Sequence, residues 1–211
     1  MGAPYLLSNG DDPLDPTLRP EAWPGVEAVA GAWRSPIVIR QLGVQVDLVA
    51  LDAGAWATVN AGTPIAGALP LELLDPTRVP VPVVVSRALA ESASPVAVGD
   101  RFPLTVEGGA IDVEVVAVVD AFPSLAAGDR FVVVPRPAVQ AQDPALLQDT
   151  MQVWLRAPDT AAADLDAAVA ARPDGPRLTG RAAVAATIAR SPVVRTVTAG
   201  LALTTLVAAI Y

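Results

Sequence analysis

Carboxylates and arginines are the charged side chains with which this chain could do chemistry. It has 22 acidic and 14 basic residues, the basic ones are all arginine, and it has no histidine and no cysteine. Catalysis by Ser-His-Asp or Cys-His groups, zinc sites built from His and Cys, Schiff bases and the lysine of phosphate-binding loops are therefore excluded. We accordingly predict no catalytic residue, no cofactor-binding residue, no cofactor and no metal ligand.

Two kinds of functional site could be built from carboxylates alone: a glycosidase site and a calcium site. A pair for glycoside hydrolysis is chemically possible, but nothing in the spacing singles out a pair, and the aromatic content of 4% offers few platforms for sugars. The cluster Asn9–Pro16, NGDDPLDP, has oxygens that could bind calcium. Its spacing departs from the helix-loop-helix pattern, and no glutamate closes a loop of about 12 residues. We therefore interpret the cluster as a solvated linker.

The sequence Gly-Asp-Arg-Phe occurs twice, at Gly99–Phe102 and Gly128–Phe131, each time before an extended apolar run. A true repeat should match beyond four residues, and a phosphate-binding loop needs spaced glycines that are missing here. We interpret both copies as turns in which glycine takes a positive φ and Arg-Phe opens the next strand.

The net charge of -8 is spread without a basic block, which argues against nucleic acid as a partner. The absence of cysteine excludes a disulfide framework but does not fix the compartment, since many external bacterial domains fold without one.

The alternation of apolar and polar residues in the rest of the chain indicates an α+β fold. It predicts strands and short helices, and we expect the tryptophans to lie in the core. The expected elements are strands over 24–34, 35–42, 44–52 and 150–157, a buried strand and short helix capped by Ser86, a hairpin turned at Gly108–Gly109, and a helix over 159–172 with Asp159 or Thr160 as N-cap. The expected core tryptophans are Trp23, Trp33, Trp56 and Trp154. Because strand and helix return after the β-rich middle, we expect a split α/β part with a β-rich segment inserted.

The run Thr196–Tyr211 carries no charge over 16 residues. As a helix it would span about 24 Å, less than the roughly 30 Å of a hydrocarbon core. It is either the start of a membrane helix or a buried C-terminal helix; its apolar character on every side and its threonines favour the membrane. Arg190 and Arg195 flank this run on the side that the membrane interpretation places outside, against the positive-inside rule. The N-terminus has no signal-peptide pattern, so we expect a fragment at both ends.

Several segments together resemble the extracytoplasmic domain of the FtsX-like and MacB-like permeases of ABC transporters. The resemblance covers residues 22–211, and its most specific part is the turn Val98-Gly99-Asp100. The segments are WPGVEAVAGAWR, PVPVVVSRALAES, VAVGDRFPLTVEGGAIDVEVVAVVDAFP, VVVPRPAVQAQ and ARSPVVRTVTAGLALTTLVAAI. The resemblance implies a two-lobed external domain at the cell membrane, a split α/β lobe with a β-rich lobe inserted at about 80–140, followed by the start of a transmembrane helix.

These considerations divide the chain into a linker or N-terminal remnant at 1–21, an extracytoplasmic permease domain at 22–192 and the start of a truncated membrane helix at 193–211. The resemblance further implies a non-catalytic role that transmits ATP-driven movement, with an ABC ATPase subunit, a second permease copy and an external cargo or partner protein as partners. Two other classes stay open on the sequence: a carboxylate-dependent, β-rich extracellular hydrolase, and a membrane-tethered adhesion or scaffold domain.

Overall fold

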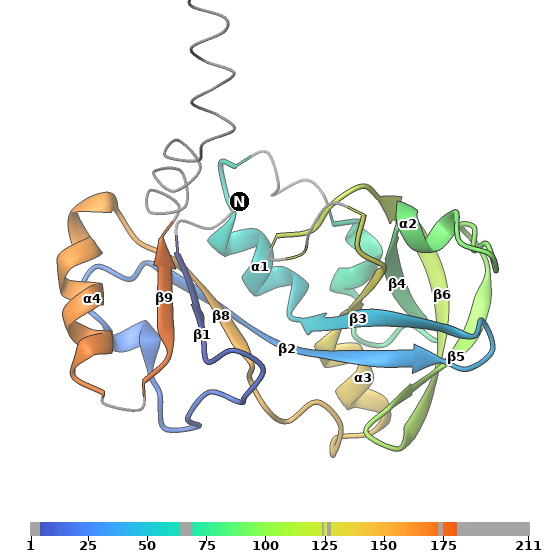
Figure 1. The fold of residues 1–211 in the computed structure, drawn as a ribbon, viewed down its shortest axis with the longest axis horizontal. Helices are drawn as coiled ribbons and strands as arrows, with labels where there is room; N and C mark the ends of the chain where they lie inside the picture. The colour runs from blue at the N-terminus through green and yellow to red at the C-terminus, as the bar shows by residue number, and fades with distance from the viewer. Residues whose placement is uncertain (1–4, 64–68, 124, 126–127, 173–174, 181–211) are drawn as a thin grey trace, which may run out of the picture.

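The computed structural model describes residues 5–63, 69–123, 125, 128–172 and 175–180. These residues form one nine-stranded sheet in the order β5-β6-β4-β7-β3-β2-β8-β1-β9, with short helices beside it (Figure 1). The strands are β1 (Tyr5–Ser8), β2 (Ala28–Ile39), β3 (Val44–Leu51), β4 (Val81–Ser86), β5 (Arg101–Val106), β6 (Gly109–Val119), β7 (Phe131–Pro135), β8 (Gln152–Arg156) and β9 (Arg177–Gly180). The helices are η1 (Pro20–Ala22), α1 (Ala53–Val59), η2 (Leu71–Leu74), α2 (Arg87–Ala90), α3 (Arg136–Gln142), η3 (Asp159–Ala161) and α4 (Ala162–Ala170). The predicted α+β class is confirmed.

The sheet is mixed and curved. The pairs β3–β7 and β4–β6 are parallel, and the other pairs are antiparallel. The sheet curls so far that its edge strand β5 lies against β2 (Figure 1). The segment expected as a β-rich insertion supplies β4 to β7, and these strands continue the same sheet through the β3–β7 pair.

Apolar side chains cover both faces of the sheet. In β3, Val46 and Leu48 face the cluster enclosed by the curve, while Val49 and Leu51 face the cluster under α1. This division follows from the two-residue period of a strand. A third cluster lies at the other end of the sheet, where α4 and the N-terminal segment pack on β1 and β8.

The prediction that 1–21 form a linker or N-terminal remnant is wrong for the described residues 5–21. Tyr5–Ser8 pair with β8 on one side and with β9 on the other, so β1 lies inside the sheet. Leu7, Leu14 and Leu18 are buried in the third cluster. The acidic residues between these leucines hid the apolar positions, which gain enough from burial to fix the segment.

The expected strands over 24–34 and 35–42 are a single strand, β2, which begins at Ala28. It runs through Pro36, a residue that lacks the N–H needed for a second ladder. Pairing explains this, because β2 pairs with β8 only over residues 28–32 and with β3 over 32–39. Pro36 therefore lies where one edge of the strand has no ladder within the described residues.

The hairpin of β5 and β6 is confirmed, with its turn one residue earlier than predicted. Val106 pairs with Gly109, so the two turn residues are Glu107 and Gly108, both with positive φ at 47° and 88°. A two-residue turn of this kind matches the twist of the strands that it joins. Glu107 also accepts a hydrogen bond from the N–H of Leu147 at 2.7 Å, which holds its unusual backbone in place.

Helix starts were predicted with mixed success. Ser86 caps α2 as expected, because its hydroxyl accepts the N–H of Leu89 at 3.1 Å. The predicted cap of the later helix is wrong: Asp159 and Thr160 lie in η3, and α4 begins at Ala162 without a side-chain cap. The helix α1, capped by Asp52, was not predicted.

Three of the four tryptophans are core residues as predicted: Trp33, Trp56 and Trp154 are buried. Trp56 lies on α1 and not in a strand pattern; its ring stacks on Phe122 and meets Trp154 edge-on, with centroids 5.0 and 4.7 Å away. Trp23 is half-buried and packs on the third cluster.

The tail prediction concerns residues 193–211, which lie outside the described residues. Among the described residues, no helix has the length and apolar character needed to cross a membrane.

Candidate functional site

The residues that sequence analysis weighed for metal binding do not converge on a centre. In the described part of the chain, no group of three or more carboxylates is placed to hold a metal ion. Asp11, Asp12 and Asp15 are exposed along the segment 9–21, which we call the N-terminal loop. Asp15 instead accepts the N–H and the hydroxyl of Thr17, both at 2.8 Å, and so fixes a turn of the loop.

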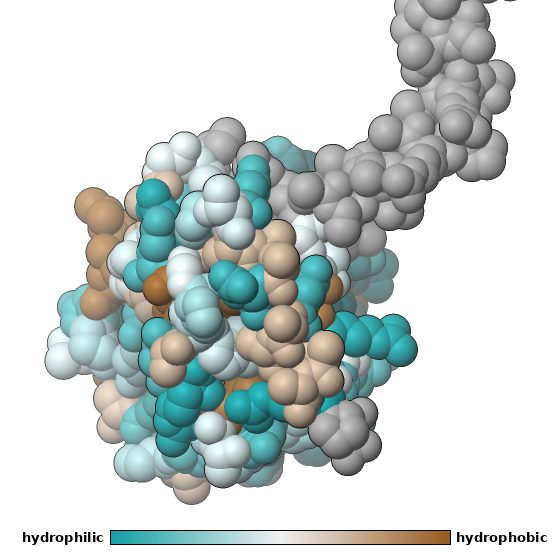
Figure 2. Space-filling model, turned by 90° about the vertical axis from the view of Figure 1, so that its left-hand side faces the viewer, coloured by the Kyte–Doolittle hydropathy of each residue, from teal (hydrophilic) through white to brown (hydrophobic). Residues whose placement is uncertain are grey.

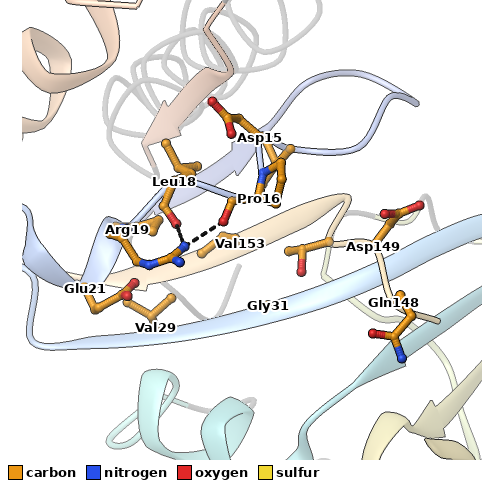
Figure 3. A pocket seen from close by; sticks show the side chains of 13 residues that line it. Asp15, Pro16, Leu18, Arg19, Glu21, Val29, Gly31, Gln148, Asp149 and Val153 are labelled. Carbon is orange, nitrogen blue, oxygen red and sulfur yellow. Dashed lines mark hydrogen bonds between the residues drawn. The ribbon is translucent and has the colours of Figure 1, made fainter. Parts of the chain in front are cut away.

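The N-terminal loop encloses a hollow of about 380 Å³, which we call the main hollow (Figure 3). Its floor is formed by β2 and β8, one wall by the N-terminal loop, and the other by residues 148–150. The lining residues are Leu14, Asp15, Pro16, Leu18, Arg19, Pro20, Glu21, Val29, Gly31, Gln148, Asp149, Thr150 and Val153.

Hydrogen bonds fix the two walls. The N–H of Leu14 donates to the carbonyl of Thr150 at 2.7 Å and so ties the walls together. Arg136, at the start of α3, donates to the carbonyl of Gln148 at 2.7 Å and to the hydroxyl of Thr150 at 3.4 Å. Partial burial lowers the pKa of Arg136, while the negative charges of Asp149 and Glu107 act in the opposite direction. The second wall is thus anchored by a partly buried cation.

The floor of the main hollow is apolar. Val29 and Val153 supply side chains from β2 and β8, and Leu18 closes the floor from the loop. Gly31 lets Thr150 approach this floor closely: a Cβ at this position would lie 3.2 Å from the Cγ2 of Thr150. A glycine inside a strand allows such a close approach of a neighbouring segment.

The rim is charged, with three carboxylates and one guanidinium. Glu21 and Asp149 lie toward opposite ends of the hollow, and Arg19 extends over Val153 (Figure 3). The Nη1 atom of Arg19 donates to the carbonyls of Pro16 and Leu18 at 2.7 and 2.9 Å, so this cation is held by its own loop. The N–H and then the hydroxyl of Thr17 lower the pKa of Asp15, which keeps that carboxylate ionised.

The N-terminal loop also borders two smaller hollows. One, of about 290 Å³, shares Leu14, Asp15 and Leu18 with the main hollow and extends toward β9. The other, of about 240 Å³, lies beside Asp11 and the ion pair of Arg34 with Asp47. None of the three hollows was predicted, because the loop was expected to be a linker; the spacing of Leu14 and Leu18 among polar residues was the available signal.

The two Gly-Asp-Arg-Phe copies are turns, as predicted. Gly99 and Gly128 have φ values of 95° and 94°, and Phe102 and Phe131 lie at the starts of β5 and β7. The first copy closes against β6 through the N–H of Gly99, which donates to the carbonyl of Val115 at 2.8 Å. The second copy borders a shallow groove of about 370 Å³ beside Asp47. The two copies thus have different surroundings, which agrees with two separate turns and not with a structural repeat.

The surface at the α4 end is mixed in character. Figure 2 views this end and shows hydrophilic side chains interspersed with apolar ones over its described part, with the strongest apolar colour at one margin. This end of the molecule therefore presents small apolar areas between charged groups.

No model of a known protein family matches this chain, and no curated protein matches it. Similar solved structures do exist. The extracellular domain of the noncanonic ABC-type transporter YknZ from Gram-positive bacteria is 15% identical, with a TM-score of 0.46 over 76% of this chain and 84% of that chain. The periplasmic region of MacB from Actinobacillus actinomycetemcomitans is 11% identical, with a TM-score of 0.49 over 90% and 95%.

A domain of a putative permease protein from Porphyromonas gingivalis is 14% identical, with a TM-score of 0.43 over 82% of this chain and 84% of that chain. These three structures are of the kind that the sequence resembles in residues 22–211.

Proposed function

We propose that this chain is the external, non-catalytic domain of an FtsX/MacB-like ABC transporter permease. In this role it is held between two membrane helices, it transmits ATP-driven movement, and it binds a cargo or partner protein outside the membrane. The observation that carries the proposal is the position of Tyr5 and Gly180, the first and last described residues. Both lie at the same side of the sheet.

The pairing of β1 with β9 fixes this arrangement. The strands are antiparallel neighbours, and Tyr5, at the start of β1, is directly opposite Gly180, at the end of β9. Figure 1 shows the two strands side by side. A domain inserted between two membrane helices must leave and re-enter the membrane on one side, and adjacent antiparallel strands provide such an exit. The uncharged run at 196–211 would begin the second of these helices.

The curved sheet suits a domain that passes on movement. The proposed β-rich lobe contributes β4 to β7, and the proposed α/β lobe contributes β1, β8 and β9 with α4. The long strands β2 and β3 run between them, so a displacement at the chain ends would be carried along a continuous hydrogen-bonded sheet.

The chemistry of the chain supports a non-catalytic role. Histidine, cysteine and lysine are missing from the whole sequence. Asp15, which lines the main hollow, has a lowered pKa, whereas the general acid of a glycosidase needs a raised one. The role would depend on an ABC ATPase subunit and on a second permease copy, reached through parts of the permease beyond this domain.

Thiol labelling in intact host cells tests the proposed location. Cysteine is absent from the chain, so Ala110→Cys on β6 and Ala163→Cys on α4, both exposed positions, each introduce one thiol into this domain. A maleimide that does not cross membranes should label both variants equally in intact and in lysed cells, and should not label this domain in the unsubstituted protein. Labelling that requires lysis would contradict an external position.

A further inference from the structure

We propose that the main hollow binds an extended polypeptide segment of an external partner, in which a basic side chain lies next to an apolar one. This inference rests on the proposed function for its orientation. Its chemistry rests on the lining of the hollow alone.

The hollow lies on the side of the molecule away from the chain ends. The N-terminal loop leaves β1 after Ser8, which pairs with Arg177, at the opposite end of the strand pair from Tyr5 and Gly180. In Figure 1 the loop continues from the lower end of β1, while the start of β1 and the end of β9 lie at the top of the strand pair. A domain held to the membrane at Tyr5 and Gly180 would therefore present the hollow to partners outside.

The charged residues that line the hollow favour binding of a cation. Asp15, Glu21 and Asp149 give three negative charges, and Arg19 gives one positive charge that is already held by the carbonyls of Pro16 and Leu18. The lining residues thus have a net negative charge, of which Arg136, behind the second wall near Asp149, and Arg172, near Asp15, offset a part. The whole chain, at a net charge of -8, adds to the attraction of a basic partner.

The floor of the hollow favours an apolar side chain next to the basic side chain of the bound peptide. Val29, Val153 and Leu18 line this floor with apolar side chains; Val29 is half-buried, and only small parts of Val153 and Leu18 are exposed. The volume of about 380 Å³ is at the small end of ligand sites, which span roughly 300–1,000 Å³, and suits a pair of adjacent side chains. An extended peptide can place an apolar side chain on this floor while a lysine or arginine reaches Glu21 or Asp149.

The test uses two peptides that differ only in charge, acetyl-Leu-Lys-Leu-amide and acetyl-Leu-Gln-Leu-amide, titrated into the isotope-labelled chain. The lysine peptide should shift the amide signals of Gly31, Thr150 and Val153, and should bind about three- to tenfold more tightly than the glutamine peptide. Added salt should reduce this difference, because both carboxylates at the ends of the hollow are exposed.

A matched pair of variants separates the site from general attraction. Glu21→Gln with Asp149→Asn should remove the preference for lysine, while Glu72→Gln with Asp112→Asn, two exposed carboxylates away from the hollow, should keep it. Equal binding of the two peptides, shifts centred elsewhere, or equal losses in both double variants would overturn the proposal. These outcomes leave the labelling result untouched, and a failure of the labelling would leave the peptide result intact, so the two proposals fail separately.

Discussion

The hydroxyl oxygen of Ser86 accepts two hydrogen bonds in the core. The backbone N–H groups of Leu89 and Phe131 donate to it, both at 3.1 Å, and the residue is 1% exposed. One side chain thus caps α2 and joins this helix to the central strand β7. The cap was predictable from the sequence because it is local, whereas the second bond, which spans 45 residues, was not.

Ser86→Ala should therefore destabilise the domain more than loss of an ordinary cap. It leaves two buried N–H groups without an acceptor, and each buried unpaired group costs about 1–3 kcal/mol. Asp52→Ala is the matched control, since Asp52 caps α1 through a single bond to the N–H of Ala55 at 2.9 Å and is exposed. We expect a loss of about 1 kcal/mol for Asp52→Ala and at least about twice that for Ser86→Ala, measured by urea unfolding. Equal losses would show that the bond to Phe131 contributes nothing.

Gly99→Val should cost more than Asp100→Ala. Gly99 has a φ of 95°, and the space around its missing Cβ is empty, so backbone strain of about 1–2 kcal/mol or more is the main penalty. Asp100→Ala loses one exposed bond, from the N–H of Ala97 at 2.7 Å, worth about 0.5–1.5 kcal/mol. Similar shifts of the urea midpoint for the two variants would count against this assignment of the strain.

At the level of elements, β1 joins the third cluster to the rest of the sheet. Tyr5 and Leu7 point into that cluster, and Leu6 packs on the other face. A chain that begins at residue 22 would lose the strand between β8 and β9 together with Leu14 and Leu18. The domain boundary predicted at residue 22 thus cuts through a packed unit.

Leu7→Ala should cost about 2–5 kcal/mol, because Leu7 is fully buried. Leu6→Ala should cost less, since Leu6 is only half-buried on the opposite face of the same strand. Thermal unfolding of the two variants beside the parent measures the difference. If Leu6→Ala proved as damaging as Leu7→Ala, the face assignment of β1 would be wrong.

Local patterns in the sequence were enough to predict several elements. The alternation in β3, the two-residue turn between β5 and β6 and the Ser86 cap each depend on neighbours in the chain, and each was found within a residue or two. The strand β1 and the main hollow could not be found this way. Both depend on contacts with residues more than 130 positions away, such as the bond from Leu14 to Thr150.

The helix α1 was missed for a different reason. Tryptophan, threonine and valine favour strands by composition, and α1 contains one of each. The cap at Asp52 and packing of Trp56 on Phe122 and Trp154 override that preference.

The stability of the whole molecule should be nearly constant from about pH 6 to pH 9. The chain has no histidine, cysteine or lysine, whose side chains ordinarily titrate in or near this range. The pKa values of Asp15 and Asp75 are lowered by hydrogen bonds from Thr17 and Thr77, and that of Tyr5 is raised, first by burial and then by the charges of Asp159 and Asp166.

The directions of these pKa shifts determine how the stability falls at low pH and at high pH. The lowered carboxyl pKa values contribute stability above about pH 4, and this contribution is lost as the pH falls through their folded values. The raised pKa of Tyr5 contributes stability below about pH 10, which is lost as the pH rises above that, and Tyr5→Phe should flatten the alkaline limb. Unfolding midpoints measured from pH 3 to 11 test both limbs. A step between pH 6 and 9 would contradict the prediction.

The central claim, that this domain moves with the ATPase cycle of a permease, is tested most directly by distances between two labelled copies. Ala110→Cys on β6 and Ala163→Cys on α4 place spin labels on exposed positions at opposite ends of the sheet. Pulsed electron paramagnetic resonance on the purified transporter with its ATPase would compare the nucleotide-free state with the state trapped by ATP and vanadate. We predict a shift of the distance distribution at one position or both. Unchanged distributions at both positions in a preparation that hydrolyses ATP would contradict the account.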